Sequence, residues 1–199
     1  MNRAVLFLAG LITLPAIGLA VAYVEPMTVP ADGQQVPAPI TVQTCFEPEN
    51  NCAAVVVRAL GLAEATAMTG AYALTEPSII QALVDAKRRG VDVELIVDKG
   101  VPCERHSGVP AVVAAGIPVW VDSKVRLAHW KTIVIDGHLV VAGSFNFSVA
   151  ASHNSEDLVT IDSPDVAAQF ANHWRARRDA STPYQLREDW CPVGTGMVR

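Results

Sequence analysis

The hydrophobic residues in the first half of the chain follow two alternating patterns. Short apolar runs, which are typical of strands, occupy residues 40–46, 66–74, 91–97 and 117–121. Segments with apolar residues spaced three and four apart, which predict helices, occupy residues 51–64, 75–89 and 109–115. This alternation of strands and helices favours a mixed α/β sheet that contains parallel strand pairs.

The second half of the chain has a different order of elements. Strands are predicted at 131–135, 139–142 and 158–161, and Asp136-Gly137 is a turn that joins the first two into a hairpin. Ser163-Pro164 then begins a final helix that runs to about residue 178. The predicted fold is α/β, with a mixed, largely parallel β-sheet flanked by helices on both faces.

The chain begins with a segment that differs from the rest. Residues 4–24 carry no charge and follow Arg3, and Ala20-Val21-Ala22 fits an A-x-A cleavage pattern. Residues 1–22 are therefore expected to be a cleaved signal peptide or a retained membrane anchor, and either places the protein outside the cytoplasm. We expect residues 23–40, which contain four prolines, to be a linker, and residues 41–199 to form the domain.

The cysteines agree with an oxidising compartment. Cys45, Cys52, Cys103 and Cys191 are even in number, and three pairings are possible. We favour Cys45–Cys52 with Cys103–Cys191, because the first pair closes a short strand-to-helix loop. A zinc site is the alternative, but no clustered Cys/His spacing supports it.

The net charge of −5 argues against a protein that coats nucleic acid in general, so any binding of a polyanion must be local. The basic clusters at 87–89 and 175–178 are interpreted as solvated helix ends.

Five polar side chains stand at the ends of the predicted strands in the second half. His129 and Lys131 are two residues apart and so point to the same side of a strand, as do Ser144 and Asn146, and Glu156 precedes the next strand. Ammonium and amide groups suit an anion with several oxygens, and a neutral imidazole is a competent nucleophile. A carboxylate can fix the imidazole tautomer, and no Asp/Glu cluster suited to Mg²⁺ accompanies the set. The sequence therefore predicts phosphoryl chemistry without a metal or cofactor.

The same residues form a known motif. His129-x-Lys131-x4-Asp136, then GSFNFS at 143–148, then Asn154-Ser155-Glu156 resembles the phospholipase D superfamily, most closely its small secreted endonucleases with a single motif. The resemblance extends from about Val42 to Trp174. Residues 71–75 read AYALT where AYSFT is usual, and two further features depart from the usual pattern: Trp130 in the middle of HxK, and the loop after residue 99. These departures leave the preferred substrate open.

This resemblance implies a role for each motif residue. His129 would attack phosphorus and form a phosphohistidine, Lys131 and Asn146 would hold the non-bridging oxygens, and Ser144 would assist. Glu156 would orient a histidine ring, and Asp136 would brace the motif.

The mechanism needs two histidines, but the motif occurs once. His138 and His153 are poor candidates for the second, so we expect a two-fold homodimer that shares one active site.

Three functions remain open after the sequence has been read. The preferred one is a metal-independent endonuclease on DNA or RNA. The first alternative is a phospholipase D that releases phospholipid headgroups, such as that of phosphatidylcholine, which association with a membrane through residues 4–24 would favour. The second alternative is a non-catalytic module that binds nucleic acid or lipid, although the intact motif argues against it.

Overall fold

The computed structural model describes residues 40–185 and residue 191. The predicted signal peptide or anchor (1–22) and nearly all of the predicted linker (23–40) lie outside these residues. Within the described part of the chain, no helix has both the length and the hydrophobicity needed to cross a bilayer.

One sheet organises the domain. Its strands are β1 (Thr41–Glu47), β2 (Thr66–Ala71), β3 (Asp92–Asp98), β4 (Val119–Asp122), β5 (Lys131–Ile135), β6 (Leu139–Gly143), β7 (Glu156–Asp162) and β8 (Thr182–Pro183), in the spatial order β1-β7-β6-β5-β2-β3-β4-β8. The sheet is mixed, as predicted, but it is not largely parallel. Among the described strands only the pairs β2–β3 and β3–β4 are parallel, because the strand–helix alternation stops after β4 and no α-helix separates β5, β6 and β7.

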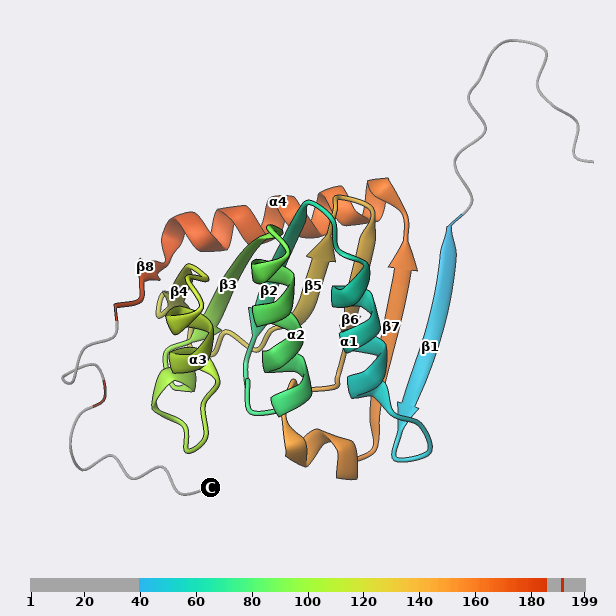
Figure 1. Ribbon diagram of the computed structural model, residues 1–199, viewed down its shortest axis with the longest axis horizontal. Helices are drawn as coiled ribbons and strands as arrows, with labels where there is room; N and C mark the ends of the chain where they lie inside the picture. The colour runs from blue at the N-terminus through green and yellow to red at the C-terminus, as the bar shows by residue number, and fades with distance from the viewer. Residues whose placement is uncertain (1–39, 186–190, 192–199) are drawn as a thin grey trace, which may run out of the picture. The chain divides into compact units, whose positions relative to one another are not determined.

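Helices cover both faces of the sheet, as predicted. Helices α1 (Cys52–Leu62), α2 (Pro77–Arg88) and α3 (Val109–Ala114) lie on one face, and α4 (Pro164–Ala180) crosses the strands on the other (Figure 1). Two short 3-10 helices, η1 (Val101–Cys103) and η2 (Val149–His153), lie in the connecting loops.

The helix starts follow from local side chains, with one correction. Asn51 caps α1, because its Oδ1 accepts a hydrogen bond from the Ala54 N–H at 2.9 Å, and Ser163 caps α4 in the same way. The sequence Thr75-Glu76-Pro77 predicts Thr75 as the cap of α2, and this prediction is wrong. The Thr75 N–H donates to the Phe147 carbonyl instead, and Glu76 caps the helix through the Ser78 N–H.

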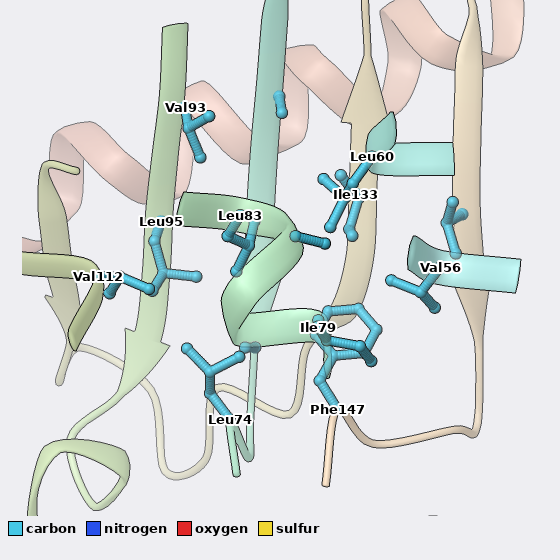
Figure 2. Close-up of a cluster of buried hydrophobic side chains, with 14 of the residues drawn as sticks. Val56, Leu60, Leu74, Ile79, Leu83, Val93, Leu95, Val112, Ile133 and Phe147 are labelled. Atoms are coloured by element: carbon cyan, nitrogen blue, oxygen red, sulfur yellow. The ribbon is translucent and has the colours of Figure 1, made fainter. Parts of the chain in front are cut away.

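The main core lies between the sheet and helices α1, α2 and α3. Figure 2 shows aliphatic side chains from these helices meeting those from the strands; the labelled residues are Val56, Leu60, Leu74, Ile79, Leu83, Val93, Leu95, Val112, Ile133 and Phe147. A smaller cluster, which includes Val134, Val140, Ala167 and Ala171, packs under α4 on the other face. Burial on both faces explains why the central strands are nearly continuous apolar runs.

The cysteines pair as favoured from the sequence. Cys45–Cys52 joins β1 to the start of α1, and Cys103–Cys191 ties η1 to the C-terminal segment. All four sulfurs are therefore in disulfides, which removes the zinc alternative for them.

Strand direction assembles the motif at one edge of the sheet. Ala71, the last residue of β2, pairs with Lys131, the first of β5, and Gly143, the last of β6, pairs with Leu158 near the start of β7. The ends of β2 and β6 and the starts of β5 and β7 thus share one edge, although 60 residues separate Ala71 from Lys131 in sequence.

Candidate active site

His129 lies in the extended segment just before β5. Its side chain is exposed, and its ring stands edge-on to Tyr72 with the two ring centroids 4.4 Å apart. The Tyr72 N–H donates to the Trp130 carbonyl at 2.7 Å, which continues the β2–β5 pairing beyond the strand ends. The imidazole is thereby held at the sheet edge with its ring open to solvent.

Asp98, at the end of β3, holds the segment that carries His129. One oxygen of this buried carboxylate accepts from the Ala128 N–H at 2.8 Å, and the other accepts from the Gly100 N–H at 2.9 Å. Partial burial and the nearby charge of Lys131 lower the pKa of His129, and Asp98 opposes this shift. The neutral, nucleophilic imidazole is therefore favoured near pH 7.

Lys131 is buried, with 8% of its surface exposed. Its Nζ donates to the His129 carbonyl at 3.4 Å and lies 5.4 Å from the centroid of the Tyr72 ring. Burial lowers the pKa of Lys131, while the charge of Glu156 acts in the opposite direction. A weakly solvated ammonium beside an imidazole is a strong donor for an anionic oxygen.

Ser144 and Glu156 are joined across the β6–β7 connection. The Ser144 Oγ–H donates to Glu156 Oε2 at 2.5 Å and accepts from the Asp157 N–H at 2.9 Å. Asn154 donates to the other Glu156 oxygen at 2.9 Å. These contacts fix the carboxylate, whereas its proposed role in orienting a histidine ring stays a prediction.

Asn146 lies in the GSFNFS loop between two buried phenylalanines, Phe145 and Phe147. These rings anchor the loop in the core, which turns the intervening polar side chain away from it. The Asn146 Oδ1 is buried and has no hydrogen-bond partner among the described residues. Buried polar groups are normally paired, so this carboxamide is available for a group that the protein itself does not supply.

Asp136 lies at the opposite end of β5 from Lys131. Its carboxylate accepts from the N–H groups of Glu64, Ala65 and Thr66 at 2.7–2.9 Å, and its φ of 50° forms the hairpin turn. Partial burial acts to raise the pKa of Asp136, but these donors outweigh it and hold the pKa below its usual value. Asp136 thus links the hairpin to the start of β2 and does not join the group at the other edge.

The two other histidines of the motif region lie elsewhere. His138 follows the same turn and pairs with Asp162 at 2.9 Å, at the edge opposite His129, where a separate cleft of about 680 Å³ opens. His153 is exposed at the end of η2.

A cleft of about 480 Å³ adjoins His129 and Lys131. Trp130, Val125 and Leu127 contribute from the chain around the motif, and His173 and Arg177 contribute from α4. Sequence reasoning singled out neither Asp98 nor His173. The position of Asp98 at the end of an apolar strand was a usable signal, whereas nothing in the sequence placed α4 beside Trp130.

Across residues 40–185 and 191, no three His, Cys, Asp or Glu side chains lie together in a way that could hold a metal ion.

Comparison with known proteins decides the family. Residues 56–177 match the family described as "Cardiolipin synthase, PLD-like domain". The chain belongs to the phospholipase D superfamily. A protein named phospholipase D from Rickettsia typhi is 33% identical over 142 residues, which cover 71% of this chain and 70% of that protein. A mitochondrial cardiolipin hydrolase from Xenopus laevis is 31% identical over 108 residues, about half of each chain.

Two solved structures show the same fold. Nuc from Salmonella typhimurium, described as a phospholipase D family member, superposes with a TM-score of 0.70 at 36% identity, over 74% of this chain and 99% of that one. NucT from Helicobacter pylori gives a TM-score of 0.68 at 17% identity and shows the fold alone. The family resemblance found in the sequence is confirmed, and the chain is a phosphodiester hydrolase of the phospholipase D type.

Proposed function

We propose that this protein is a metal-independent endonuclease that cleaves DNA or RNA outside the cytoplasm. The observation that carries the proposal is that the buried Lys131 ammonium, which donates to the His129 backbone carbonyl, and the open His129 ring both contact Tyr72 at one edge of the sheet. This pair supplies both a nucleophile and a fixed positive charge, which are the two requirements of phosphoryl transfer without a cation.

The proposed reaction has two displacements. A ring nitrogen of His129 attacks phosphorus, a P–N bond forms, and the P–O bond to the leaving nucleotide breaks as a second imidazole gives that oxygen a proton. Water, which loses its proton to the same second imidazole, then attacks phosphorus, and the P–N bond breaks. Lys131 and Asn146 donate to the non-bridging oxygens in both steps, and Glu156 accepts a hydrogen bond from an imidazole.

The second imidazole comes from His129 of another copy. His138 is paired with Asp162 at the opposite edge, which leaves the motif with one histidine per chain. A two-fold homodimer that joins the two edges brings two His129 rings and two Lys131 side chains to one phosphodiester. Doubling the local positive charge also offsets the acidic composition of the chain.

Extracytoplasmic action is supported by both disulfides, which persist in oxidising compartments. We propose further that residues 41–199 are the catalytic domain, that residues 23–40 are a linker, and that residues 1–22 direct export or anchor the domain. Mass spectrometry of the exported protein tests the last point: a mature N-terminus after residue 22 supports cleavage, and an intact Met1 supports an anchor.

One specific observation favours a second candidate. The Rickettsia typhi relative is named phospholipase D, so hydrolysis of a phospholipid headgroup is the alternative activity. A non-catalytic binding module is the weakest candidate, because the complete set of motif residues would then have no role.

A substrate panel in EDTA separates these candidates. Purified protein is incubated with DNA, RNA and phosphatidylcholine vesicles, with and without chelator. Cleavage of nucleic acid in EDTA supports the proposal, and activity on lipid alone reverses the order of the two enzymes. Loss of all activity in EDTA refutes the metal-free mechanism, and no turnover with or without chelator leaves the binding module.

The shared site is tested with differently tagged subunits. Heterodimers of wild type and His129→Ala are purified through both tags and compared with the wild-type homodimer. A shared site predicts that the heterodimer loses nearly all turnover, since it holds one imidazole. Half of the wild-type activity in the heterodimer contradicts the shared site.

A further inference from the structure

The cleft beside His129 is lined on one side by the aromatic rings of Trp130 and His173. Trp130 follows the catalytic histidine directly and points to the other face of the sheet, where one face of its indole packs on the backbone of Gly70. A Cβ added at Gly70 would lie 2.9 Å from the indole, so the ring fits closely against β2. The exposed imidazole of His173 lies 5.2 Å from the indole, tilted by 35°. An aromatic wall therefore lines the cleft that His129 and Lys131 also border.

The loop before His129 adds apolar side chains to the cleft. Val125 and Leu127 line the cleft with 37% and 42% of their surfaces exposed, although most aliphatic side chains among the described residues are buried. Lys124 and Arg126 alternate with them and are also exposed. The loop thus offers apolar contact next to the aromatic wall, with cations on either side.

The charges that line the cleft exclude a cationic ligand. Its one lining carboxylate, Asp122, is fully buried and binds both Arg177 Nε and Nη2, at 2.9 and 2.7 Å. No carboxylate among the cleft-lining residues is left for an ammonium group, because the charges of Asp122 and Arg177 balance, and Lys131 adds a positive charge. A quaternary ammonium headgroup, which needs aromatic faces and negative potential together, is disfavoured here.

A nucleobase satisfies all these features. It is flat and uncharged, it stacks on aromatic side chains in a way that tolerates any sequence, and it is attached to the anionic phosphodiester that His129 and Lys131 would bind. The cleft volume of about 480 Å³ lies in the range of sites for small organic groups. We propose that the cleft formed by Trp130, His173 and Val125–Leu127 is a subsite that takes the nucleobase next to the scissile phosphate. The proposal rests on the nuclease activity proposed above.

Two oligonucleotides test the subsite. One single-stranded DNA is intact, and the other carries abasic residues on both sides of a single cleavable phosphodiester. The subsite predicts that wild type cleaves the intact strand with a kcat/KM at least about tenfold higher, because one stacked base is lost in the other strand. Equal kcat/KM for the two strands overturns the proposal and leaves the nuclease activity standing.

Variants at His173 locate the effect, since this side chain is exposed on a helix and its replacement spares the core. His173→Ala is expected to raise KM for the intact strand about tenfold and to leave the abasic strand unaffected. His173→Phe should restore the wild-type KM for the intact strand, because phenylalanine can stack on a base although it cannot transfer a proton. Asn172→Ala, an exposed neighbour that does not line the cleft, is the matched control. An equal loss on both strands in His173→Ala, or no rescue by phenylalanine, contradicts stacking.

Binding without turnover separates failure of the subsite from failure of the proposed function. The NMR signals of His173 are followed while dAMP, deoxyribose phosphate or phosphocholine is added to the full protein. A shift with dAMP alone supports the subsite even if no oligonucleotide is cleaved, in which case the nuclease proposal fails. A shift with phosphocholine and none with dAMP overturns the subsite in favour of a lipid headgroup.

Discussion

The buried carboxylate of Asp98 gives the sharpest prediction about how the site is held. Asp98→Asn keeps the shape of the side chain, but replaces one acceptor oxygen with an NH₂ group that faces a backbone N–H. The variant loses one of the two bonds to Ala128 and Gly100 and leaves one buried N–H without a partner. A hydrogen bond to a charged group contributes about 1.5–3 kcal/mol, so we expect the free energy of unfolding to fall by about 3 kcal/mol.

The same change acts on the nucleophile through charge and position. Asp98 raises the pKa of His129, so removal of its charge should lower that pKa further below 6.5. Turnover should also fall, because in one orientation of the amide in Asp98→Asn the Ala128 N–H has no acceptor and the His129 segment is held less firmly. Urea unfolding measures the first effect and an NMR titration of His129 the second. Asp92→Asn, an exposed carboxylate at the other end of β3, is the control. Unchanged stability with an unchanged His129 titration would refute this reasoning.

Three further predictions follow from the contacts. Lys131→Met should lower kcat by about two orders of magnitude or more, because a transition-state donor is lost. It should also raise the pKa of His129, which moves the acid limb of the kcat/KM profile to higher pH; an unchanged profile would leave Lys131 a structural role only. Asp136→Ala should cost about 2 kcal/mol of unfolding free energy, and Asp136→Asn less, because three N–H donors lose the carboxylate. Folding lowers the pKa of Asp136, so the difference in unfolding free energy between wild type and Asp136→Ala should be largest above pH 5 and should shrink as the pH falls through 3.8 and below. A difference that stays constant in urea unfolding measured across this pH range would contradict the role of the carboxylate charge. Replacing Cys103 and Cys191 together by serine should lower stability by about 2–4 kcal/mol in thermal melts, and a melting temperature equal to that of wild type under oxidising conditions would show that the bridge does not constrain the unfolded chain.

Much of the fold could be predicted because local signals agreed with it. The cap at Asn51, the turn at Asp136-Gly137 and the start of α4 at Ser163 each depend on a few adjacent residues. The fraction of parallel pairs could not be predicted in this way. Where a hairpin joins the rest of the sheet depends on long-range pairing, such as that of β5 with β2, which no local pattern encodes.

The site shows the same division between local and long-range information. Spacing along the chain was enough to predict that His129 and Lys131 share one side, and positions at the ends of the predicted strands added Asn146 and Glu156. The contribution of Asp98 depends on a hydrogen bond between residues 30 apart in sequence. The meeting of Trp130 with His173 depends on how α4 crosses the sheet. Both contacts are made by tertiary packing, so they become visible once the structure is known.

If the imidazole of His129 attacks phosphorus without a metal ion, a covalent intermediate forms on that side chain and can be trapped. Protein in EDTA is mixed with excess oligonucleotide and quenched in alkali within one turnover, and its peptides are weighed by mass spectrometry. We expect the peptide that contains His129 to carry a fragment of the oligonucleotide joined through its terminal phosphate, and we expect neither adduct nor turnover in His129→Gln. Full turnover in EDTA with no adduct on that peptide, or an active His129→Gln variant, would contradict nucleophilic attack by His129.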